Sequence, residues 1–144
     1  MIQSLCRAVA LANGLLLLSA TGCSSNEPKI VPVSGTVTRN GQPVANITIH
    51  FEPEKGRPSW GRSDDNGRYT LNYERGRDGA VTGTHKVFVE FRARSPDEES
   101  QMAEGKLKVP QDRQAILDKY GKRDSPAITL EVTPKTTTYD LKLD

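Results

Sequence analysis

The stretch from residue 31 to residue 51, VPVSGTVTRNGQPVANITIHF, decides the fold of this 144-residue chain. Before the Asn40-Gly41 dipeptide, valines alternate with mostly polar residues, and after it large apolar residues alternate with polar ones up to Phe51. A period of two is typical of a half-buried β-strand, and Asn-Gly between two such runs is a strong hairpin signal. The stretch therefore predicts two antiparallel strands that each bury one face.

The same alternation recurs downstream and predicts an all-β domain. Residues 60–63 are expected to form a short edge strand, and Asp64-Asp65-Asn66-Gly67 a turn, because these residues bond their own backbone or accept positive φ. Further strands are expected around Leu71, Val87, Leu130 and Leu141, with a loop over 74–83. The side chains expected to form the core are Val31, Val33, Val37, Ile47, Ile49, Phe51, Tyr69, Leu71, Tyr73, Val87, Val89, Phe91, Ile116, Leu117, Tyr120, Ile128, Leu130, Val132, Tyr139, Leu141 and Leu143.

One excursion interrupts the strands. Residues 93–108 are charged and follow neither period, so they are predicted to form a long, mobile surface loop. A short helix is expected near 110–120, because Pro110 and Asp112 are typical of a helix start and Gly121 of a helix end. With 12 glycines, 9 prolines and 35% hydrophobic residues, the composition fits a turn-rich body. About seven strands predict an antiparallel β-sandwich of the transthyretin-like or immunoglobulin-like kind.

The beginning of the chain has the pattern of a secretory leader. Arg7 precedes an apolar run from Ala8 to Leu18, and small residues follow up to Gly22, as in a signal peptide with its short helix. The run is too short for a spanning helix, which needs about 20 apolar residues. Residues 1–22 are therefore expected to be removed from the exported protein.

Ala20-Thr21-Gly22-Cys23 resembles a lipobox. The resemblance implies that Cys23 takes a diacylglyceryl group and becomes the new N-terminus, although ordinary signal peptidase could also accept Ala20 and Gly22. Residues 23–30 are then the lipidated cysteine and its tether, of which residues 24–29 reach about 20 Å when extended, and residues 31–144 are the domain. Cys6 lies in the leader, so Cys23 is the only cysteine left after cleavage. Ser24 resembles the residue that follows the lipid site in outer-membrane lipoproteins.

Four segments between residues 33 and 87 resemble the carboxypeptidase regulatory-like domain, and together with Lys119-Tyr120 and a segment near 125–130 they span nearly the whole mature chain. They are VSGTV (33–37), GQPVANI (41–47), DNGRYTL (65–71) and GAVTGTHKV (79–87), and the segment SPAITL (125–130) resembles the end of small planctomycete-type lipoproteins. The resemblance implies a transthyretin-like sandwich and a non-catalytic accessory or adhesive role. We expect Gly35 and Gly41 to relieve backbone crowding. Such domains usually carry tyrosine where this chain has His85.

The side chains that could carry chemistry are few. His50 and His85 are the only histidines and have no ligand spacing, so we expect no metal or cofactor, with His50 facing outward and His85 at the rim of the core. The acids of the 64–67 turn are adjacent, which favours a plain turn over calcium. Trp60, the only tryptophan, either packs over a sheet edge or stacks on a sugar or a partner. Phe88 either pairs across strands or joins that contact surface.

Three functions compete on these grounds. We expect a lipid-anchored, non-catalytic binding or structural module of the cell envelope, whose partner is an envelope protein or a glycan. A carbohydrate-binding module that uses Trp60 and Phe88 is one alternative. A transthyretin-fold hydrolase that uses His50 or His85 is another, although this chain lacks the Tyr-Arg-Gly-Ser ending of that enzyme family. Nucleic acid is not expected, because 20 basic residues are interspersed with 18 acidic ones and form no basic stripe.

Overall fold

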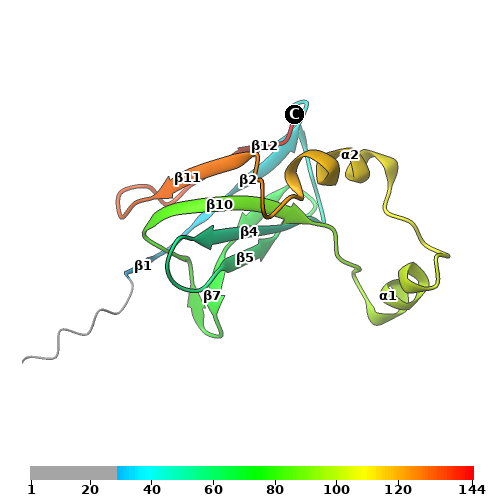
Figure 1. Cartoon of the computed structure of the whole chain (residues 1–144), viewed down its shortest axis with the longest axis horizontal. Helices are drawn as coiled ribbons and strands as arrows, with labels where there is room; N and C mark the ends of the chain where they lie inside the picture. The colour runs from blue at the N-terminus through cyan, green and yellow to red at the C-terminus, as the bar shows by residue number, and fades with distance from the viewer. Residues whose placement is uncertain (1–28) are drawn as a thin grey trace, which may run out of the picture.

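The computed structural model of the protein describes residues 29–144. The predicted leader 1–22, Cys23 and the tether up to Pro28 lie outside the described residues. The strands are β1 (Ile30–Val31), β2 (Ser34–Arg39), β3 (Gln42–Pro43), β4 (Thr48–Pro53), β5 (Ser59–Arg62), β6 (Arg68–Thr70), β7 (Asn72–Glu74), β8 (Arg77–Asp78), β9 (Ala80–Val81), β10 (Gly83–Glu90), β11 (Ile128–Val132) and β12 (Leu141–Lys142), and the helices are α1 (Pro96–Ala103) and α2 (Gln111–Tyr120). Most of the elements are strands, and both helices follow β10 and precede β11 in the chain (Figure 1).

The strands form two larger sheets and one small pair. The six-stranded sheet has the order β11-β10-β4-β5-β7-β8, the four-stranded sheet pairs β12, β3 and β6 with β2, and β1 pairs with β9. The all-β prediction is therefore confirmed. The expectation of purely antiparallel strands is wrong at one pair, because Leu141 of β12 lies beside Val37 of β2 in parallel. The last segment leaves the six-stranded sheet after β11 and follows β2 in the same direction.

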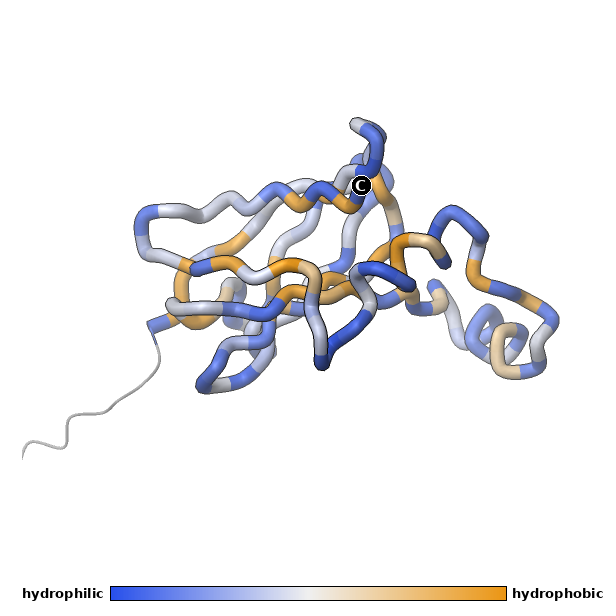
Figure 2. The backbone as a smooth tube through the Cα atoms, turned by 45° about the horizontal axis from the view of Figure 1, so that its top comes forward, coloured by the Kyte–Doolittle hydropathy of each residue, from blue (hydrophilic) through white to orange (hydrophobic). Residues whose placement is uncertain are grey.

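One hydrophobic core joins the two larger sheets and α2. Of the residues predicted to face inward, all but Tyr73 and Phe91 belong to this core or pack against it. Val44 and Ala80 complete it. Figure 2 shows hydrophobic residues along the strands of the body and mostly hydrophilic ones at the hairpin tips and around α1. The alternation of apolar and polar residues therefore identified the buried faces, as a half-buried sheet requires.

The first hairpin has the predicted turn. Arg39 pairs with Gln42, and the two residues between them adopt positive φ, 49° at Asn40 and 74° at Gly41. Two consecutive residues with positive φ are the signature of the type I′ turn, whose twist matches that of antiparallel strands. The predicted turn is therefore confirmed. The prediction that the alternating run up to Phe51 is the second strand of this hairpin is wrong, because only β3 pairs with β2, and the chain then crosses to the other sheet, where β4 pairs with β5 and β10.

The strand predicted around Leu71 is divided between the two sheets. β6 pairs with β2, and β7 pairs with β5. The chain crosses from one sheet to the other at Leu71, so Tyr69 and Leu71 are buried while Tyr73 is only half-buried. The predicted loop over 74–83 contains the short strands β8 and β9, and β5 is an interior strand of its sheet rather than an edge.

Residues 93–108 are not the irregular loop predicted from their charge, because they contain α1. Ser95 caps this helix: its Oγ accepts a hydrogen bond from the Glu98 backbone N–H at 3.2 Å. Pro96 opens the first turn, which also holds three acidic residues, as favoured at helix N-termini. No α1 residue is buried. The prediction rested on apolar periodicity, and this helix has no apolar stripe that would give such a period.

The predicted helix near 110–120 is confirmed as α2. It begins after Pro110 and ends at Gly121, and it buries Ile116 and Tyr120. β1 and α1 lie at opposite ends of the molecule's long axis (Figure 1). Within residues 29–144, neither helix is long and apolar enough to cross a membrane.

Candidate functional site

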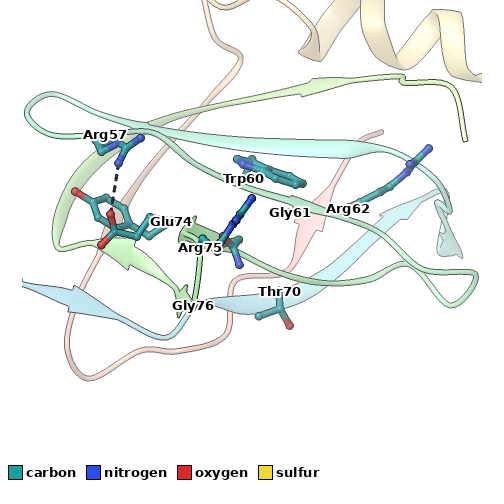
Figure 3. A pocket seen from close by; sticks show the side chains of 10 residues that line it. Arg57, Trp60, Gly61, Arg62, Thr70, Glu74, Arg75 and Gly76 are labelled. Carbon is teal, nitrogen blue, oxygen red and sulfur yellow. Dashed lines mark hydrogen bonds and ion pairs between the residues drawn. The ribbon is translucent and has the colours of Figure 1, made fainter. Parts of the chain in front are cut away.

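An open groove of about 880 Å³ surrounds Trp60 (Figure 3). β5 supplies Trp60 itself, and the β7–β8 hairpin supplies the opposite wall with Arg75 and Gly76 at its tip. The lining residues are Arg57, Trp60, Gly61, Arg62, Thr70, Asn72, Tyr73, Glu74, Arg75 and Gly76. The groove thus combines aromatic side chains, amide and hydroxyl groups, and several guanidinium groups.

Trp60 lies on the open face of the six-stranded sheet. It pairs with His50 of β4 on one side and with Asn72 of β7 on the other. Its relative exposure is 53%, and among the described residues only Leu107 is another large hydrophobic residue with comparable exposure. One of the two interpretations from the sequence was that Trp60 packs over a sheet edge. This interpretation is wrong, because β5 is an interior strand and the Trp60 indole faces solvent. A flat apolar ring held this way can stack on a planar or ring-shaped ligand.

The arginines of the groove differ in how strongly the protein already engages them. Arg62 donates from Nε to Asn46 at 2.7 Å and from Nη2 to the carbonyls of Arg92 and Ala93. Arg57 reaches Glu74 at 3.4 Å, but Glu74 is shared with Arg77 at 3.0 Å.

Arg75 stands across from Trp60 at the hairpin tip (Figure 3). Within residues 29–144 it has no carboxylate within salt-bridge distance, in contrast to Arg57 and Arg77. Arg75 is exposed. Its guanidinium is therefore the one in this groove that is most available to a ligand.

Phe88 does not share the exposed surface with Trp60. Its ring stacks on His50 with centroids 4.7 Å apart and planes 5° from parallel, and it is buried at 7% exposure. Both Phe88 and Trp60 flank His50 on the same sheet face. The structure therefore favours the cross-strand interpretation of Phe88, and a ligand would meet Trp60 without it.

His50 belongs to a polar network on this face. Its Nε2 lies 3.0 Å from a Glu90 carboxylate oxygen, and the same carboxylate pairs with Arg92. Burial lowers the pKa of His50 below its usual value, although Glu90 acts in the opposite direction. The neutral ring thus donates to Glu90 and stacks on Phe88, so His50 is held as part of the sheet surface.

His85 lies on the opposite face of the same sheet. It is fully buried in the core, at 0% exposure, rather than at the rim as predicted, because it follows the inward parity of Val87 and Val89 on β10. Its Nε2 is 2.7 Å from the Val81 carbonyl oxygen, so Nε2 carries the proton, while Nδ1 has no partner among the described residues. The structure therefore does not bring His50 and His85 together.

The buried imidazole makes stability depend on pH. Burial lowers the pKa of His85 below 6.5. Above pH 6.5 both the folded and the unfolded chain hold a neutral ring. Below it only the unfolded chain binds the proton, so the free energy of unfolding falls by up to about 1.4 kcal/mol per pH unit until the folded-state pKa is reached. Urea unfolding at pH 7.5, 6.5 and 5.5 measures this loss.

The matched variants separate the two histidines in that experiment. His85→Gln retains a donor for Val81 and is expected to reduce the slope between pH 6.5 and 5.5 by the part that His85 causes. His50→Gln is the control, and it is expected to retain the part of the slope that His85 causes. An undiminished slope in His85→Gln would contradict the assignment.

In the acidic turn at 64–67, the Asp64 carboxylate is hydrogen-bonded to the backbone of the turn and of the residue after it. Asp64 Oδ1 accepts hydrogen bonds from the backbone N–H groups of Asn66 and Arg68 at 2.9 and 2.8 Å. The predicted plain turn is confirmed, because this carboxylate is used to close it. Across residues 29–144, no group of three His, Cys, Asp or Glu side chains is arranged to hold a metal ion.

Several residues of the groove were not predicted from the sequence. Arg57 lies in a segment that was expected to be a polar connection, and Arg75 in one expected to be a loop. Tyr73 was expected to face the core. The Arg77 guanidinium lies 5.8 Å from the centre of the half-buried Tyr73 ring. The run of basic residues around Gly76 was a usable signal, since a glycine between arginines predicts a basic hairpin tip.

The residues that point to a site are thus Trp60 and the guanidinium groups around it, on a face that also carries the His50–Phe88 pair. The resemblance to the carboxypeptidase regulatory-like domain stays a prediction from sequence motifs. No family model, curated protein or solved structure matches this chain.

Proposed function

We propose that this protein is a lipid-anchored, non-catalytic binding module of the bacterial cell envelope. The observation that carries the proposal is the segment Ala20-Thr21-Gly22-Cys23 at the end of an apolar run. Several acyl chains on one residue anchor a protein firmly, since each buried methylene contributes about 0.8 kcal/mol. The domain would be held at the membrane, with the outer membrane favoured by Ser24.

The body of the protein supports a binding role through the groove around Trp60. We propose that the two larger sheets form a transthyretin-like sandwich, since they share one core. The groove lies on the open face of one sheet, where a half-exposed indole and the exposed guanidinium of Arg75 can contact a partner. Because β1 begins at Ile30, the spacer after Cys23 is short, so the domain would remain close to the membrane.

The anchor is tested by metabolic labelling and by mass spectrometry of the mature N-terminus. Wild-type protein is expected to incorporate labelled palmitate and to partition with membranes, whereas Cys23→Ala is expected to lose all label and to become water-soluble. Cys6→Ala is the matched control, because Cys6 lies in the predicted leader, and it should label as well as wild type. An unacylated wild-type N-terminus would overturn the proposal.

Carbohydrate binding is the more specific form of this function. One observation favours it: Trp60 is 53% exposed on the face of a sheet, beside amide and hydroxyl side chains. Sugar rings present apolar C–H faces and polar edges, which such a surface complements.

A further inference from the structure

We propose that the groove around Trp60 binds acidic polysaccharides, with one pyranose ring stacked on the indole and its carboxylate paired with Arg75. The inference rests on the proposed binding function and names the class of ligand. It follows from three features of the groove: the exposed aromatic ring, the excess of positive charge, and the Arg75 guanidinium, which alone among the arginines lining the groove has no partner within residues 29–144.

The aromatic platform fixes where a sugar would lie. Trp60 is anchored in β5 between β4 and β7, so its backbone is held by two neighbouring strands. Figure 3 places the indole in the middle of the groove, with Arg75 beside it and Arg57 and Arg62 at its two ends. A rigid ring costs little conformational entropy on binding, which makes it an effective contact for a sugar face.

The charge of the lining favours an anion. Three arginines and one acidic residue, Glu74, line the groove. Glu74 is shared between Arg57 and Arg77, both of which are about half exposed or more. Such surface ion pairs contribute little stability, so a ligand carboxylate can replace Glu74 at Arg57. Arg75 needs no rearrangement, and its planar fork matches a carboxylate in a bidentate pair.

Other anionic partners fit the groove less well. A nucleic acid would need a basic stripe that follows its phosphates, and the single exposed indole and one hairpin tip do not form one. A membrane surface would meet side chains at loop tips, whereas Trp60 lies on a sheet face between paired strands. A neutral glycan would leave the excess of guanidinium charge without a counterpart.

The only tryptophan of the chain reports directly on this site. Full-length protein in detergent micelles is titrated with galacturonate and hyaluronate hexamers at low salt, and tryptophan emission is recorded. We expect emission at shorter wavelength and protection from acrylamide quenching as the indole is covered. The fully methyl-esterified galacturonate hexamer has the same ring without the charge, and it should bind about tenfold more weakly.

Calorimetry of matched variants assigns the contacts. Trp60→Ala should raise the Kd for the acidic hexamer about tenfold or more, in the range known for aromatic stacking. Arg75→Gln should raise it about fivefold and so reduce the preference for acid over ester to about twofold, and Arg75→Lys should fall between wild type and Arg75→Gln. Lys135→Gln removes an exposed charge outside the groove and should leave the Kd unchanged.

Four results would overturn the inference. They are no binding of either acidic hexamer, equal affinity for acid and ester, unchanged affinity in Trp60→Ala, and binding of the unlipidated Cys23→Ala protein to phosphatidylglycerol vesicles in place of the hexamers. The same titrations on Cys23→Ala separate this inference from the anchor. If the unlipidated protein binds the sugar, the inference about the groove holds even where the proposed acylation is wrong.

Discussion

Replacing Phe51 by alanine is expected to lower the free energy of unfolding by about 3–5 kcal/mol. Phe51 is the largest fully buried side chain of the core, at 0% exposure. Its ring lies within 6.5 Å, centre to centre, of three others: 6.4 Å from Tyr69, 5.8 Å from His85 and 6.3 Å from Tyr139. These rings come from β6, β10 and the last segment of the chain, so the substitution would open a cavity where both larger sheets meet.

A loss of this size is a large part of the total stability of a domain of this length, which is about 5–15 kcal/mol. Urea unfolding followed by circular dichroism measures it. Phe91→Ala is the matched control, because Phe91 is only half-buried and lies outside the core cluster. It should cost about 1 kcal/mol, in keeping with its partial burial. Equal losses in the two variants would show that the core is not centred on Phe51.

The fold could be predicted where local pattern alone determines structure. Alternation along β4 and β10 identified the buried side of each strand, and Asn40-Gly41 identified the first turn. Both signals act between residues that are close in sequence. The helix α2 was predicted for the same reason, since Pro110 and Gly121 bracket it.

The features that were missed depend on contacts between distant segments or on weak local signals. The alternation that includes Tyr73 continues from Tyr69, yet the chain changes sheets at Leu71, and only the pairing of β5 with β7 determines this. α1 lacks buried residues, so only the signals at its start, the Ser95 cap, Pro96 and the acidic first turn, could have indicated it.

The candidate site shows the same division. Trp60 was singled out because it is unique in the chain, but its neighbours Tyr73 and Arg75 lie on a hairpin whose position no local pattern specifies. Phe88 and His50 were predicted to point outward, and they do share the outer face. Cross-strand pairing of Phe88 was one prediction, but His50 could not be identified as its stacking partner, because the register between β4 and β10 depends on the whole sheet.

Gly35→Ala is expected to lower the free energy of unfolding by more than about 3 kcal/mol. A Cβ at this position would lie 2.0 Å from the Tyr139 carbonyl oxygen and 2.7 Å from its carbon. These are backbone atoms, so no side chain can rotate away, and the last segment would have to move off β2. The sequence prediction that Gly35 relieves crowding is thereby supported by a specific contact.

The contacts at risk are those that attach the end of the chain to β2. Tyr69 donates its hydroxyl proton to that same Tyr139 carbonyl at 2.6 Å, and the Tyr139 N–H donates to the Ser34 carbonyl at 2.8 Å. The Asp140 carboxylate accepts from the backbone N–H and the hydroxyl of Thr36 at 2.8 and 2.7 Å. Each neutral hydrogen bond of this kind contributes about 0.5–1.5 kcal/mol, and bonds to a charged group contribute more.

Gly41→Ala separates steric conflict from backbone strain. Gly41 has a φ of +74°, and a Cβ there would meet nothing within 4 Å beyond its own chain neighbours. The crowding that Gly41 relieves is therefore that of its own backbone at positive φ, and not a contact with a distant segment. Its substitution should cost only about 1 kcal/mol, the penalty of placing alanine at positive φ. Urea unfolding of both variants tests the difference. If Gly35→Ala cost no more than Gly41→Ala, the close approach of β2 and Tyr139 would not be a determinant of the fold, and the parallel pairing of β12 with β2 would have to be held by the hydrogen bonds alone.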